Sequence, residues 1–247
     1  MQTPVNERFP RDTRFDVEFD RIPNLFWYPY VGQDFQPSRS RVMVFAHNIP
    51  IPPDDCETTM QKWKSKDAWA DKDTLGEYTY CRGWWTKPFR YFVKGSVGLQ
   101  EDYDENSPPE VTERVDAFIR RISYINYIQG VVPSERQMAN APNHQVEMSQ
   151  EINRQFLSIL GVTHCICWGK HVYDYLMSTK AHKVLEEKKA AIGGFATAVL
   201  ESEPGRFIRL LKTYHPSMPS FRPYSAQTQT IISEFLREEP VGSFTRT

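Results

Sequence analysis

Short apolar runs alternate with amphipathic segments along most of this chain, and this alternation restricts the fold more than any other feature. The run RVMVFAH at 41–47 is continuous and apolar, as in a strand that is buried on both faces. The other predicted strands cover 123–132, 163–168, 195–202 and 206–215, and a Pro-Gly turn joins the last two into a pair.

Helical periodicity fills the intervals between these strands. The predicted helices cover 109–122, 149–161, 170–177, 181–193 and 225–239. Ser149 is the expected N-cap of the second helix and Gly161 its expected stop. Strands that alternate with helices predict an α/β domain with a largely parallel central sheet and helices on both faces. We expect a single domain at 41–247, with residues 1–40 as an N-terminal arm packed on it.

Composition excludes several classes of protein. The 247 residues carry a net charge of −1, so any nucleic-acid binding must come from a local basic patch. There is no run of about 18 apolar residues that would span a membrane. The first 16 residues lack the apolar core of a secretory signal. We therefore expect a cytoplasmic protein, and we expect it to be a monomer.

Four cysteines, Cys56, Cys81, Cys165 and Cys167, raise the question of disulfides or a metal cluster. They lack the Cys-x-x-Cys spacing of zinc and iron–sulfur sites. Cys165 and Cys167 lie two residues apart in a predicted strand and so share one face. We interpret the cysteines as small buried apolar residues and expect neither metal nor cofactor.

Polar residues lie at or near the ends of three predicted strands, namely Asn48, Asn126 and His215. In parallel sheets, ligand sites gather at the carboxyl ends of the strands, so these three side chains are candidates for one site. Taken singly, each has a structural explanation: Asn48 and His215 suit turns, and Asn126 suits a hydrogen-bonded core position.

The remaining histidines are less informative. His47, His164, His171 and His182 have no convergent partner in the sequence, and taken singly we interpret them as structural or surface residues.

Three motifs, in this order, resemble the uracil-DNA glycosylase superfamily. VMVFAHNIP resembles its first motif, with Asn48 at the Asp/Asn position that holds a water. YINYIQ resembles the second, with Asn126 as the amide that reads the base. YHPSMPSF resembles the third, with His215 facing the leaving base. CICWGKHVYDYL and FWYPYVGQDF also resemble segments of this group, so the likeness covers about residues 24–237.

The resemblance implies a monofunctional DNA glycosylase that flips a pyrimidine out of the helix and leaves an abasic site. The first motif departs from the best-known members because it has Ala46 and Pro50 where they have Gly and Tyr. That tyrosine excludes bulky substituents at the pyrimidine 5-position, so its absence leaves room for a larger base. With Asn48 in place of Asp, the motif is closest to the single-strand-selective and mismatch-specific branches, and slower chemistry is expected.

The resemblance also implies roles for further residues. The candidates for base binding, besides Asn126, are His47, Pro50, Trp84, Trp85 and Phe89, the last three as stacking rings. A stretch without acidic residues, RFIRLLKTYHPSMPSFRPYS, supplies the candidates for DNA contact: Lys212, Ser217, Met218, Ser220, Phe221 and Arg222. Met218 or Phe221 is expected to wedge into the stack that the flipped base vacates.

Three alternatives stay open. The same chemistry can be directed at a hypermodified viral base, which would make the protein a defence enzyme. The fold can instead serve as a catalytically inert nucleic-acid-binding module. An iron–sulfur branch is a weaker fourth hypothesis, which a colourless, iron-free preparation would exclude.

Overall fold

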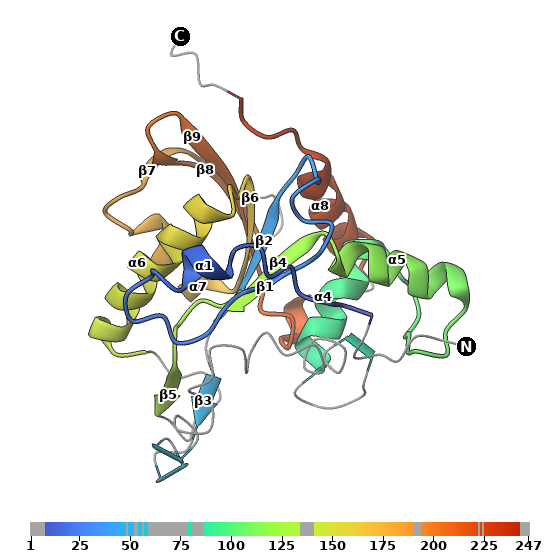
Figure 1. Cartoon of the computed structure of the whole chain (residues 1–247). Helices are drawn as coiled ribbons and strands as arrows, with labels where there is room; N and C mark the ends of the chain where they lie inside the picture. The colour runs from blue at the N-terminus through green and yellow to red at the C-terminus, as the bar shows by residue number, and fades with distance from the viewer. Residues whose placement is uncertain are drawn as a thin grey trace.

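The computed structural model describes residues 8–47, 49–51, 54–55, 57–58, 79–80, 86–133, 141–189, 194–221, 223 and 225–242 (Figure 1). These residues form a mixed α/β domain around a seven-stranded sheet in the order β1-β4-β2-β6-β9-β8-β7. Its strands are β1 (Tyr30–Val31), β2 (Val42–Ala46), β4 (Ile122–Asn126), β6 (His164–Trp168), β7 (Lys183–Lys189), β8 (Ala196–Glu203) and β9 (Arg206–Thr213). Two short strands, β3 (Ile49–Ile51) and β5 (Val131–Pro133), form a separate parallel pair.

The four central strands β4, β2, β6 and β9 are parallel, whereas β1, β8 and β7 add to the sheet in antiparallel fashion. The expected largely parallel sheet is therefore confirmed for the centre, with antiparallel strands at both edges. All five residues of β2 and of β6 are buried, which explains why both read as continuous apolar runs.

Helices cover both faces of the sheet (Figure 1). One core layer packs under α1 (Asp16–Phe19), α6 (Asn143–Ile159) and α7 (Lys170–Met177). The other packs under α4 (Lys87–Val97), α5 (Pro109–Ile119) and α8 (Ala226–Arg237). We call these the α7 face and the α4 face. Cys165 and Cys167 are both fully buried in the α7 face, as predicted, whereas Cys56 and Cys81 lie outside the described residues.

Two predictions about the helices are wrong. Residues 183–189 form the edge strand β7, not part of a helix, and pair with β8 through a bulge between Val184 and Glu186. Lys, Glu and Leu favour helices locally, but pairing with β8 overrides that weak preference, and charged residues protect an exposed sheet edge. Ser149 is not an N-cap, because α6 begins six residues earlier, at Asn143.

The predicted strand at 123–132 is in fact two strands. β4 ends at Asn126, and β5 begins only at Val131, after a turn in which Gly130 has φ 91°. Ser149, inside α6, accepts a hydrogen bond from the backbone N–H of Gln129 in this turn, at 2.9 Å. Asn126 therefore ends a strand of the central sheet, at the same carboxyl edge at which β9 ends before His215.

The described part of the N-terminal arm packs on the domain. Tyr30 and Val31 pair with β4, and Trp27 and Phe35 are buried. Gly32 follows directly and donates its N–H to the carbonyl of Ile122 at 3.0 Å.

Gly32 is expected to tolerate no side chain. A Cβ built there would lie 2.2 Å from the carbonyl oxygen of Arg120 and 2.8 Å from that of Ile119, and this backbone cannot move aside cheaply. We expect Gly32→Ala to lower the free energy of unfolding by about 2–3 kcal/mol, as measured by urea denaturation. Gly242→Ala is the steric control, because nothing lies within 4 Å of its Cβ position and its φ is not in the left-handed region. A Gly32→Ala variant as stable as the wild type would contradict this packing.

Candidate active site

At the carboxyl ends of the parallel strands, β2 stays paired with β4 but separates from β6. β2 stays paired with β4 through the register Ala46↔Asn126, and Ile128 N–H donates to the carbonyl of His47 at 3.1 Å. The register between β2 and β6 ends earlier, at Phe45↔Cys167. β2 and β6 also lead to strands on opposite sides, which makes the gap between them a topological switch point, where α/β sheets bind ligands.

His215 follows β9 at this edge. Its ring lies edge-on to Trp168, the last residue of β6, with the centroids 5.8 Å apart. The backbone N–H of Ser217 donates to His215 Nδ1 at 3.3 Å, and the Ser217 hydroxyl lies 2.7 Å from the same nitrogen. A backbone N–H can only donate, so Nδ1 is an acceptor, and the neutral ring carries its proton on Nε2.

Burial lowers the pKa of His215 to about 4. The ring is therefore neutral at pH 7, and its Nε2–H is a hydrogen-bond donor without a charge. A neutral donor of this kind can stabilise an oxygen that becomes negative during a reaction.

Asn126 ends β4 and is 4% exposed. It alternates with Tyr124 and pairs with Ala46, which both belong to the α4 face, so its side chain is on that face. Within the described residues no hydrogen-bond partner is seen for its amide. A buried amide costs free energy unless it finds partners, and a bound ligand can supply them.

A row of aromatic rings on the α4 face leads from Trp168, beside His215, to Tyr124, two residues before Asn126. Phe89, from α4, lies edge-on to Tyr124 with the centroids 5.0 Å apart, and Tyr124 lies 5.5 Å from Trp168. Phe89 is one of the three predicted stacking rings. It is only 1% exposed, so it is a core residue next to the site. The sequence did not predict Tyr124 and Trp168 as members of this group of aromatic rings.

A second cluster lies at the same edge on the α7 face. The rings of His47 and His171 stack with centroids 5.2 Å apart and planes 13° apart. The ring centroid of Tyr175, one turn further along α7, lies 6.2 Å from that of His47 and 6.4 Å from that of His171. Burial, with smaller effects of His171 and His215, lowers the pKa of His47 to about 4. The interpretation of His47 and His171 as residues without partners is therefore wrong, because folding brings them together.

His171 was missed because a single histidine early in a helix gives no signal in the sequence. The one available clue is its position, two residues after Gly169, which has φ 90° and joins β6 to α7 at the carboxyl edge. Residues at that place in a parallel sheet deserve consideration whatever their type.

The other predicted DNA contacts lie in different environments. Ser217, Met218 and Ser220 are exposed on the loop after His215. Phe221 is fully buried in the core of the α4 face, which leaves Met218, 40% exposed, as the wedge candidate on the surface. The ammonium of Lys212 lies 5.4 Å from the ring centre of Tyr173, on the α7 face.

Several predicted site residues cannot be placed. Asn48, Trp84, Trp85 and Arg222 lie outside the described residues. Pro50 lies in β3, where it pairs with Val132.

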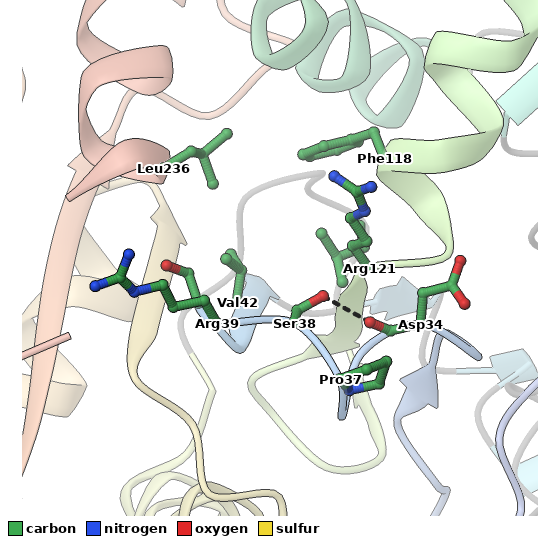
Figure 2. A pocket seen from close by; sticks show the side chains of 10 residues that line it. Asp34, Pro37, Ser38, Arg39, Val42, Phe118, Arg121 and Leu236 are labelled. Carbon is green, nitrogen blue, oxygen red and sulfur yellow. Dashed lines mark hydrogen bonds between the residues drawn. The ribbon is translucent and has the colours of Figure 1, made fainter. Parts of the chain in front are cut away.

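A cavity of about 600 Å³ lies at the opposite edge, where β2 and β4 begin (Figure 2). The apolar side chains of Val42, Phe118 and Leu236 line it, together with the charged side chain of Arg121. Because it lies at the amino ends of the strands, it is separate from Asn126 and His215 and is not part of the candidate site.

Two buried histidines predict that the fold loses stability in acid. Burial lowers the pKa of His47, at the carboxyl edge, and of His164, at the amino end of β6, to about 4. An unfolded chain binds protons at these rings from about pH 6.5 downward, whereas the folded chain does so only near pH 4. The stability that each contributes is complete above pH 6.5 and decreases between pH 6.5 and 4, by about 3 kcal/mol per ring.

Urea denaturation at pH 7 and pH 4.5 measures this loss. Burial also lowers the pKa of His215 to about 4 and lowers the pKa of His182, so these rings add to the loss. His164→Leu removes one of the buried rings and is expected to reduce the difference between the two pH values. Equal pH dependence of the variant and the wild type would contradict the assignment.

No described helix is both long and apolar enough to cross a membrane. Across the described ranges, no three His, Cys, Asp or Glu side chains are grouped so that they could hold a metal ion. No known protein-family model matches the chain, and no curated protein matches it significantly. Its function therefore has to be inferred from the site.

Proposed function

We propose that the protein is a monofunctional DNA glycosylase of the uracil-DNA glycosylase type, which removes a flipped-out, non-standard pyrimidine and leaves an abasic site. The observation that carries this proposal is that Asn126 and His215 lie at the same carboxyl edge of the sheet, on either side of the switch point between β2 and β6. A buried amide without a described partner and a neutral Nε2–H donor lie at the carboxyl ends of β4 and β9, near the aromatic rings of the α4 face. An amide that reads a base and a donor for the departing base are the two groups that this chemistry needs.

In the proposed reaction the bond between the base nitrogen and C1′ of the sugar breaks, and its electron pair leaves with the base. The negative charge spreads to a carbonyl oxygen of the pyrimidine, to which the Nε2–H of His215 donates. A water oxygen then bonds to C1′, and its proton passes to solvent. The hydrogen bond to His215 strengthens as the charge develops, so it stabilises the transition state more than the bound substrate.

Asn48 is the proposed holder of the attacking water, through its side-chain carbonyl. An amide cannot accept the proton of that water, so the rate should be lower than that of an enzyme with a carboxylate at this position. The cationic sugar in the transition state lowers the need for a strong base, because any water that bonds to it loses its proton readily.

DNA contact is proposed for the loop after His215. Exposed Ser217 and Ser220 suit hydrogen bonds to phosphate oxygens, and exposed Met218 suits insertion where the base has left the stack. The unstacking costs a few kcal/mol, which these contacts would offset. We further propose that the protein acts on DNA as a monomer.

A panel of labelled oligonucleotides tests the proposal. Single- and double-stranded DNA would contain uracil, hydroxymethylcytosine or glucosylated hydroxymethylcytosine, and treatment with hot alkali would reveal abasic sites. Nicks at one base, absent with Asn48→Ala, would support the proposal and identify the base. Nicks at none, with DNA binding retained, would instead support the inert binding module.

A defence role is the second candidate, and Pro50 favours it. The superfamily tyrosine that excludes bulky bases is replaced by this proline, which leaves room for a hypermodified viral pyrimidine. Excision of the glucosylated base, with uracil left intact, would support this role over repair.

A further inference from the structure

We propose that His171 is a positioning residue, which joins the two halves of the site through its stack on His47. This inference rests on the proposed function, because it assigns a role in the same reaction. The residue has no predicted role in the sequence, and it lies on α7, away from Asn126 and His215 on the α4 face.

The two halves of the site lie on separate hydrogen-bonded pairs of strands. Asn126 belongs to the β4–β2 pair, which continues to Ile128 and His47. His215 follows the β6–β9 pair, which continues to the bond from Gly169 N–H to the carbonyl of Thr213, at 3.0 Å. Between β2 and β6 the register ends at Phe45↔Cys167, so backbone pairing stops short of the functional residues.

The stack of His47 on His171 spans this gap beyond the end of the ladder. His47 is the first residue after β2, and His171 is the second residue of α7, directly after β6. His47 is 8% exposed, and its Nε2 is buried without a partner among the described residues. Its ring stacks on His171 and makes a tilted contact with Tyr175, which lies one turn further along α7 and also contacts His171.

Alignment of the two halves matters for the reaction. The base must meet the amide on one half and the Nε2–H donor on the other, and His47 directly precedes Asn48 in the sequence. A shift of about 1 Å between reacting groups can cost about 100-fold in rate. A contact that closes the gap is therefore expected to affect turnover more than DNA affinity.

Two variants separate positioning from chemistry. His171→Ala removes the ring, whereas His171→Phe keeps a flat ring for the stack and removes both nitrogens. We expect His171→Ala to lower the single-turnover excision rate about tenfold with little change in DNA affinity, and His171→Phe to restore most of it. Loss of activity in both variants would assign His171 a chemical role and overturn the proposal.

A double-mutant cycle with His215→Ala sharpens the test. If His171 acts by aligning His215 with the other half, His171→Ala should lower the single-turnover excision rate less than about twofold in the His215→Ala background. An equal fold-decrease of the excision rate in the wild-type and His215→Ala backgrounds would overturn the proposal.

Amide hydrogen exchange gives a readout that needs no activity. Ile128 N–H bonds to the carbonyl of His47, so loss of the stack should speed its exchange about five- to tenfold in His171→Ala but not in His171→Phe. The exchange of the Ile232 amide, inside α8 on the α4 face, should be unchanged in both variants. If the wild type excises no base, the proposed function fails, and exchange alone decides the role of His171: unchanged exchange of Ile128 in His171→Ala would overturn it.

Discussion

Replacement of His215 with alanine is expected to lower the rate of base excision about 10²- to 10³-fold, which is the usual cost of removing one donor to a developing negative charge. His215→Gln should retain part of the activity, because its amide N–H₂ can donate without a charge. Single-turnover kinetics with saturating enzyme measures the chemical step apart from product release. The matched control is His182→Gln, which should not change the rate. His182 is partly buried and lies between α7 and β7, with its Nδ1 3.2 Å from the carbonyl oxygen of Leu176.

The pH dependence of the same rate tests the state of the ring. Because burial lowers the pKa of His215 to about 4, the donor stays neutral from pH 8 down to about pH 5. No change in rate from titration of His215 is expected over that range. A rate that rises as pH falls through 7, and no longer does so in His215→Gln, would show a charged histidine and contradict the proposed chemistry.

Replacement of Asn126 with alanine is expected to lower kcat/KM for the target base by about 10²- to 10³-fold, since the amide supplies both donors and an acceptor to the edge of the base. Asn126→Asp should be at least as damaging, because a carboxylate cannot donate and places a negative charge near the departing anion.

DNA that already contains an abasic-site analogue is the control for Asn126. It has no base to read, so the wild type and both variants should bind it with equal affinity in a fluorescence titration. Weaker binding of this DNA by the variants would show that Asn126 supports the fold or the DNA contact and does not read a base.

The parallel centre of the sheet could be predicted because β2 and β6 are short apolar runs bounded by turn residues, and β9 is an apolar run interrupted by single charged residues. β2 and β6 are buried along their whole length, and such strands have a clear sequence pattern. The hairpin of β8 and β9 was equally clear, since Pro204 and Gly205 lie in the turn between them. The edge strand β7 could not be predicted, because its Lys, Glu and Leu residues favour a helix and only its pairing with β8 makes it a strand.

The candidate site was predictable in part for the same reason. Asn126 and His215 occur next to recognisable strands, and parallel strands bring their carboxyl ends to one edge. The stack of His47 on His171 could not be predicted, because it depends on how far β2 and β6 stay paired before they separate. The hydrogen bonds that set the tautomer of His215 likewise depend on the conformation of the loop that follows it.

The most direct measurement of the central claim is the product of the reaction itself. Purified protein would be incubated with DNA that carries the base identified by the oligonucleotide panel, and mass spectrometry would follow the free base and the strand. The proposed chemistry predicts one free base for each abasic site, on a strand that stays intact until alkali is added, and neither product with His215→Ala. A strand broken without alkali, or DNA bound with no base released, would contradict it.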